Sequence, residues 1–298
     1  MEKLDRIEEE LRKNVLGQDH VLGRLASVLK RGELGLTNAS RPKGSFLFLG
    51  PTGVGKTELA LSFTRYLLGE EHLFRFDMSE FMHFDSIKEF IGHSGKPGRL
   101  GNVLENNKAG ACLCLLFDEM EKAHPQILLI FLQMLDAARI TLGNNRTYDL
   151  SGLYIVFTSN IGSENILHSK RVPFATIERS VLAQLHLELR PEFIARIDEK
   201  IVFKKLEYHT QREIAVLLLE KELSRLIGKG YALSYDDSAL EFLVRRGIDR
   251  VFGARPLRNT IERHVQDALA RRIIAGKAPA GVIRYSDKLR DLVIEDMD

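Results

Sequence analysis

Gly50-Pro51-Thr52-Gly53-Val54-Gly55-Lys56-Thr57 stands directly after the apolar run Phe46–Leu49. Glycines at these positions let successive backbone N–H groups turn inward around phosphate groups, at a point where a strand passes into a helix. The Lys56 ammonium then reaches the terminal phosphates, and the Thr57 hydroxyl is placed to ligate Mg²⁺. The sequence therefore predicts a nucleotide-binding protein.

Composition sets the scale of the protein and excludes several classes. The 298 residues are 44% hydrophobic, which is enough for two modest domains with apolar cores. A net charge of +2 gives no general attraction to nucleic acid or to anionic membranes, so we expect neither as a partner. The N-terminal residues do not read as a signal peptide, and no apolar run approaches the length of a membrane span. We expect a cytoplasmic protein.

Short apolar runs alternate with helical patterns over the first two thirds of the chain, as in parallel α/β sheets. The expected strands follow Ser45 and cover Leu73–Asp77, Cys112–Phe117, Leu153–Thr158 and Lys200–Phe203. We therefore expect residues 1–205 to form a large α/β nucleotide-binding domain whose five-stranded parallel sheet is flanked by helices.

Helical patterns dominate after about Leu206. One predicted helix is capped by Thr210 and ends at Ile227, and another covers Arg255–Ala275. The last segment has β character, which favours a short hairpin. Residues 206–298 are thus expected to form a smaller, mostly helical domain.

Two acids end one of the predicted strands. Leu115-Leu116-Phe117 is followed by Asp118 and Glu119, which places both carboxylates at the sheet edge where nucleotides bind. Asp118 is predicted to be a Mg²⁺ partner. Glu119 is placed to orient and deprotonate an attacking water, which only hydrolysis requires.

At this point the chain resembles a known family, the ClpA/ClpB branch of AAA+ ATPases. The likeness covers almost the whole chain as one C-terminal-type AAA+ module with P-loop NTPase fold. It includes Glu58 beside the phosphate loop and rests on these further runs: Phe76-Asp77-Met78-Ser79-Glu80-Phe81, Asp118-Glu119-Met120-Glu121-Lys122-Ala123-His124-Pro125, Gln133-Met134-Leu135-Asp136, Thr158-Ser159-Asn160, Leu189-Arg190-Pro191-Glu192-Phe193-Ile194-Ala195-Arg196-Ile197-Asp198 and Gly253-Ala254-Arg255-Pro256-Leu257.

The resemblance implies roles for further residues. Asn160 would be the sensor-1 residue that holds the water or the γ-phosphate. Arg196 would be the arginine finger, presented to the nucleotide of a neighbouring subunit, and Arg255 would be sensor-2 of the smaller domain. Val15 and Leu16 would line the adenine pocket. Taken alone, these residues suit ordinary packing, surface charge or salt bridges equally well.

A finger that acts in trans needs an assembly, so the resemblance implies a homo-oligomer, a hexamer by family likeness, with ATP and Mg²⁺ between subunits. Threading members of the family carry an aromatic residue in a glycine-rich pore loop. The matching stretch here, Gly92–Gly101, has none. It either contacts a different, acidic partner through Lys96, Arg99 and Leu100, or is a solvated turn. The second pore segment, Gly143–Thr147, is kept in outline.

Two other family features are absent from the sequence. The range 163–189 contains no glycine and so lacks the hydrophobic-Gly-hydrophobic tripeptide that docks on a peptidase ring, which argues against a ClpP-type partner. The chain also has no first AAA+ module, so we expect either part of a longer protein or a standalone protein that is targeted by a partner.

The sequence predicts an ATPase: a ring-forming, chaperone-like Clp-type module that hydrolyses ATP to remodel or disassemble protein assemblies. The alternative is a nucleotide-gated binding or assembly factor that does not thread polypeptide. The client protein is not identified by the sequence.

Overall fold

The computed structural model describes residues 2–107, 112–169, 171–248 and 253–296. Its first part is built on five runs of apolar residues that pair in parallel in the order β2-β5-β8-β1-β9. The strands are β1 (Gly44–Leu49), β2 (Leu73–Asp77), β5 (Cys114–Asp118), β8 (Tyr154–Ser159) and β9 (Glu199–Val202). This confirms the predicted five-stranded parallel sheet, with strand ends shifted by one or two residues.

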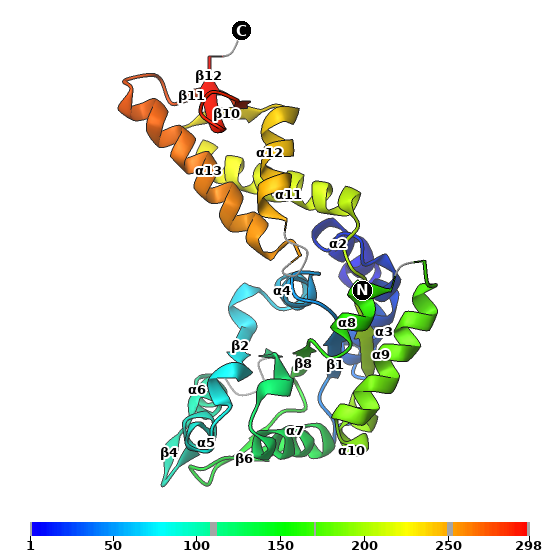
Figure 1. Ribbon diagram of the computed structural model, residues 1–298. Helices are drawn as coiled ribbons and strands as arrows, with labels where there is room; N and C mark the ends of the chain where they lie inside the picture. The colour runs from blue at the N-terminus through cyan, green and yellow to red at the C-terminus, as the bar shows by residue number, and fades with distance from the viewer. Residues whose placement is uncertain (1, 108–111, 170, 249–252, 297–298) are drawn as a thin grey trace. The chain divides into compact units, whose positions relative to one another are not determined.

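Helices cover the sheet, as expected for a parallel sheet whose strands are apolar on both faces (Figure 1). They are α1 (Glu2–Asp5), α2 (Ile7–Asn14), α3 (Asp19–Glu33), α4 (Lys56–Leu67), α5 (Phe84–Ile91), α6 (Arg99–Asn106), α7 (Pro125–Ala137), α8 (Ser163–His168), α9 (Phe174–Glu188) and α10 (Pro191–Arg196). Two small antiparallel pairs complete this part: β3 (Gly92–His93) with β4 (Lys96–Pro97), and β6 (Arg139–Thr141) with β7 (Thr147–Asp149).

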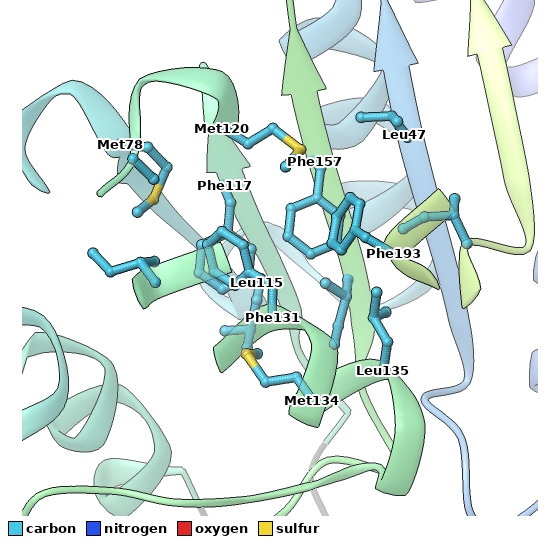
Figure 2. Packing of buried hydrophobic residues seen from close by; sticks show 14 of the residues in the cluster. Leu47, Met78, Leu115, Phe117, Met120, Phe131, Met134, Leu135, Phe157 and Phe193 are labelled. Atoms are coloured by element: carbon cyan, nitrogen blue, oxygen red, sulfur yellow. The ribbon is translucent and has the colours of Figure 1, made fainter. Parts of the chain in front are cut away.

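The main hydrophobic core lies on the face of the sheet that α7 covers. Phe117 and Phe157 stack at a centroid distance of 5.4 Å on adjacent strands. Phe131 of α7 lies 4.6 Å from Phe117 and 4.9 Å from Phe157, and Phe193 of α10 lies 5.2 Å from Phe157. Figure 2 shows these rings meeting between the strands and α7. The opposite face packs on α4, where Phe63 meets Phe46 at 5.9 Å.

The chain divides into two compact units, with residues Lys205–Asp298 and Thr52–Val54 in the second. The second unit consists of α11 (Tyr208–Ile227), α12 (Asp237–Gly247), α13 (Arg255–Ile274), β10 (Ala232–Tyr235), β11 (Ala280–Ser286) and β12 (Asp291–Glu295). Within the described residues of either unit, no helix has the length and apolar character of a membrane span.

The second unit keeps the predicted helices and the hairpin, formed by β11 and β12, with two differences. A third strand, β10, pairs in parallel with β11, and its four residues were too few to give a pattern. The predicted cap at Thr210 is wrong: the helix begins at Tyr208 after Glu207, and Thr210 is buried in its first turn.

We expect Phe117→Ala to lower the free energy of unfolding by about 3–5 kcal/mol, because it removes a ring packed among four other rings and leaves a cavity. Urea denaturation measures the change. Phe117→Leu, which keeps most of the volume, is the control and should cost clearly less. A loss below about 1 kcal/mol for the alanine variant would contradict this account of the core.

Candidate functional site

The phosphate-binding loop lies where the sequence places it, between β1 and α4. Gly50 has φ +144° and Gly55 has φ +103°, conformations that side chains with a Cβ rarely adopt. A Cβ on Gly50 would also lie 3.2 Å from the Phe203 carbonyl oxygen. The loop glycines are therefore required by backbone shape. Lys56 begins α4, and Thr57 and Glu58 follow it in the first turn.

The Lys56 ammonium is held by three acceptors, which matches its three N–H donors. It donates to the Gly50 carbonyl, to the Pro51 carbonyl at 3.0 Å and to the Asn160 Oδ1 atom at 2.9 Å. Lys56 and Asn160, which are 104 residues apart, are thus brought together at the carboxyl ends of β1 and β8. All three acceptors are neutral, so an anion that enters the loop has to displace one of them.

Burial lowers the pKa of Lys56 from its ordinary value of 10.5 to about 8. Burial in a low-dielectric environment disfavours the charged ammonium, and nearby carboxylates oppose that effect. These carboxylates are Glu121, Asp118 and Glu119, in decreasing order of influence. An ammonium and several acids therefore share this edge of the sheet.

Asp118 ends β5, and both of its carboxylate oxygens are occupied. Thr158 of the adjacent strand donates its hydroxyl to Oδ1, and Arg75 of β2 donates to Oδ2 at 2.5 Å. The same Thr158 Oγ1 atom accepts the backbone N–H of Glu119 at 3.0 Å. One buried hydroxyl therefore orients both predicted acids.

Glu119 lies in the left-handed region, with φ 55° and ψ 47°. A non-glycine residue in this conformation is uncommon, and such residues gather at active sites. Its carboxylate pairs with Lys122 at 2.9 Å and its side chain is about one quarter exposed, at 26%. The backbone turn thus leaves this acid accessible to solvent while Asp118 is buried.

Glu121 belongs to the site, although sequence reasoning gave it no role. Its Oε1 atom accepts the backbone N–H of Asn160 at 3.1 Å. Glu121 and Asn160 also line a polar cavity of about 300 Å³ beside α8 and α9, together with Glu164 and Glu188. No residue of the Gly50–Thr57 loop lines this cavity, but Asn160 belongs to both the cavity and the Lys56 contact.

The other predicted site residues come from separate elements of the chain. Val15 is buried beneath the loop, since a Cβ on Gly55 would lie 3.6 Å from the Val15 Cγ1 atom, and Leu16 follows it half-buried. Arg196 ends α10 and pairs with Asp136 of α7. Arg255 is the exposed first residue of α13 in the second unit.

The structure overturns part of the acidic-partner interpretation of the pore segment. Leu100 is fully buried in the main core, and Arg99 is paired with Glu80 and lies 5.1 Å over the Phe81 ring. Leu100 is therefore excluded as a partner contact, whereas the Arg99 side chain is engaged by Glu80 but remains 40% exposed. Lys96 alone of the three lies on the exposed β3–β4 hairpin. That hairpin packs against the second predicted pore segment, because Gly143 N–H donates to the Ile91 carbonyl at 2.9 Å.

Comparison with known proteins decides the family. A family model described as AAA domain (Cdc48 subfamily) matches residues 41–200. The chain belongs to the AAA family. A second model, the C-terminal D2-small domain of ClpB protein, matches residues 206–284. The predicted Clp-type AAA+ identity, resembling the second module, is confirmed, and with it the prediction of an ATPase.

Similar proteins cover nearly all of this chain. Chaperone protein ClpB from Aquifex aeolicus is 41% identical over 304 residues, which is 96% of this chain and 30% of the relative. The Vibrio cholerae protein of the same name is 40% identical over 283 residues, 93% of this chain and 33% of the relative. This chain spans about a third of the length of these relatives.

A solved structure has the same fold. It is described as a closed-state cryo-EM reconstruction of Hsp104:ATPyS and FITC casein. The TM-score is 0.84 at 30% identity, over 99% of this chain and 52% of that one. The predicted AAA+ fold class is thereby confirmed.

We expect ATP binding to weaken above pH 8. Bound phosphates favour the Lys56 ammonium, so binding raises the pKa of this residue from about 8 and takes up protons. Affinity should be constant below about pH 7 and fall by up to about tenfold per pH unit above pH 8. Calorimetry at pH 8 in buffers of different ionisation enthalpy measures the uptake.

The matched control for this titration is Lys56→Arg, since a guanidinium stays charged throughout the range. Its binding should show no proton uptake at pH 8. Equal uptake by the original protein and this variant would contradict the assignment of the titration to Lys56.

Proposed function

We propose that this module binds ATP at the Gly50–Thr57 loop and hydrolyses it with Glu119 as general base. The observation that carries the proposal is the contact of Lys56 with Asn160 beside Asp118 and Glu119. Lys56 would bind the terminal phosphates, and Asn160 would orient the water or the γ-phosphate. Glu119, partly exposed and held by its backbone turn, would take the proton of the water.

Thr57 and Asp118 are suited to hold Mg²⁺ with the nucleotide. Hydroxyl and carboxylate oxygens are ligands that this ion prefers, and phosphates and water complete such sites, so few protein carboxylates are needed. Consistently, no group of three or more potential His, Cys, Asp or Glu ligands is found among the described residues. When bound, the ion neutralises charge on the phosphates. Arg75, which now contacts Asp118, would have to share or yield that carboxylate.

We further propose that residues 1–205 act as the large AAA+ domain and residues 206–298 as the lid, with Arg255 as sensor-2 and with Val15 and Leu16 at the adenine. The module would work in a homo-oligomer, a hexamer by family likeness, in which Arg196 completes the neighbour's site. Location in the cytoplasm fits its two cysteines, which are both free thiols.

The proposed client is a polypeptide in an assembly or aggregate. The curated relatives are named chaperones, and the similar Hsp104 structure is described with casein. The alternative, a nucleotide-gated factor that does not thread polypeptide, rests on a hairpin that lacks an aromatic residue. It loses one of its suggested contacts, because Leu100 is buried, and a second, Arg99, is already paired with Glu80.

Glu119→Gln should keep ATP affinity within about twofold and lower turnover by about 10²–10⁴, because the amide cannot accept the proton of water. Phosphate release and nucleotide binding are measured on the same preparation. Lys56→Ala is the control, in which binding itself should be lost. Turnover close to that of the original protein would remove Glu119 from the mechanism.

Arg196→Ala should abolish the rise of turnover with protein concentration and lower the maximum by about 10³-fold or more, because the γ-phosphate loses a cation supplied by another subunit. ATP affinity at low protein concentration should not change. Turnover and sedimentation are recorded together over a dilution series. A variant that still gains activity on assembly would rule out the finger.

A further inference from the structure

The backbone around Arg196 is pinned to the start of β1. Ser45 is the second residue of that strand, and its hydroxyl lies 3.4 Å from the Arg196 carbonyl oxygen. Asp198 accepts the Ser45 N–H at 2.8 Å and the Ser45 hydroxyl at 2.7 Å, and donates its own N–H back to that hydroxyl at 3.0 Å. The end of α10 is therefore fixed to the sheet.

This attachment places Arg196 at the opposite edge of the sheet from its own phosphate loop. Five residue steps of β1 separate Ser45 from Gly50, and a strand rises about 3.3 Å per residue, which gives about 16 Å. An arginine side chain is shorter than that span. The geometry suits a guanidinium that serves another subunit.

Asp136, the second-last residue of α7, contacts Arg196 in a particular way. Its Oδ1 atom pairs with the Nε atom of the guanidinium. That Nε atom is buried, although the Arg196 side chain as a whole is 33% exposed, and its contact with Asp136 is an ion pair without hydrogen-bond geometry. Over the residues that the structure describes, neither terminal nitrogen of Arg196 donates a hydrogen bond, and Asp136 is the acid with which this arginine pairs.

We propose that Asp136 is a positioning residue for the arginine finger. Its ion pair at Nε favours one orientation of the guanidinium and leaves the two terminal nitrogens as a fork without hydrogen bonds among the described residues. That fork matches two oxygens of a phosphate group, the geometry in which arginine binds phosphate through two parallel hydrogen bonds. The inference rests on the proposed role of Arg196 in trans.

The pair is poorly suited to stabilise the fold. Asp136 is 46% exposed and Arg196 is 33% exposed, and ion pairs in such positions contribute little because water screens them. Arginine has many rotamers, and without Asp136 the guanidinium would sample several of them. Misplacing a group that must meet a transition state lowers turnover while leaving substrate binding intact.

Mixed rings test the effect in the subunit that donates the finger. Arg196→Ala subunits keep the hydrolytic residues but lack a finger, and Glu119→Gln subunits keep the finger but cannot hydrolyse. Each alone should be inactive, and mixing them should restore turnover at sites where the two meet.

The test replaces the donor with Glu119→Gln/Asp136→Ala. The matched control donor is Glu119→Gln/Asp267→Ala, which removes an exposed aspartate of α13 that has no ion-pair partner among the described residues.

We expect donors that lack Asp136 to restore about 10- to 100-fold less turnover than the control donor, with the same KM for ATP and the same sedimentation profile. Full restoration by these donors would overturn the role of Asp136 and leave the finger intact. Loss of sedimenting rings with these donors would also overturn it, since Asp136 would then support assembly. Failure of the Arg196→Ala and Glu119→Gln subunits to complement each other would instead reject the proposed function.

Discussion

The phosphate site depends on one constraint, the parallel register of three neighbouring strands. In β5 and β8 Phe117 pairs with Phe157, which puts Asp118 beside Thr158. In β1 and β8 Leu49 pairs with Ser159, which puts the start of the loop beside Asn160. A slip of one residue would turn the Thr158 hydroxyl to the other face and leave both acids without it. The aromatic rings packed under α7 prevent such a slip.

Burial and nearby carboxylates have opposite effects on the Lys56 ammonium at the carboxyl end of the sheet. Burial disfavours the charged form of Lys56, and the nearby acids only partly offset this effect, so its pKa falls to about 8. Bound phosphates add negative charge beside the ammonium to that of the nearby carboxylates and so favour its charged form. The site is thus matched to an anionic ligand, and the free protein holds its lysine in a less favourable state. Such preorganisation is typical of groups that bind charge in a dry pocket.

The sequence was informative where the functional residues are neighbours along the chain. The loop from Gly50, and the acids after Phe117, could be predicted because each depends only on neighbours along the chain. Thr158, Arg75 and Asp136 were not assigned a role, since their contacts depend on register and helix packing between distant segments. The available signal for Thr158 was its hydroxyl near the end of a buried strand, next to the strand that ends in Asp118.

For isolated residues, the family resemblance assigned roles that local sequence patterns could not. Arg196 has no local feature that separates it from a surface arginine, and its role remains a prediction. The interpretation of Leu100 as a partner contact was wrong, because a glycine-rich segment suggests an open loop. Leu100 is instead an anchor for α6, and the cation of Arg99 lies on an aromatic ring.

Strand β1 has one end in the phosphate loop and the other bound to the segment that carries Arg196. A strand in the middle of a sheet is stiff, because both of its edges are hydrogen-bonded to neighbours. The two ends of such a strand move together. In a ring whose fingers act in trans, a tilt caused by ATP in one subunit would move that subunit's finger at the adjacent nucleotide.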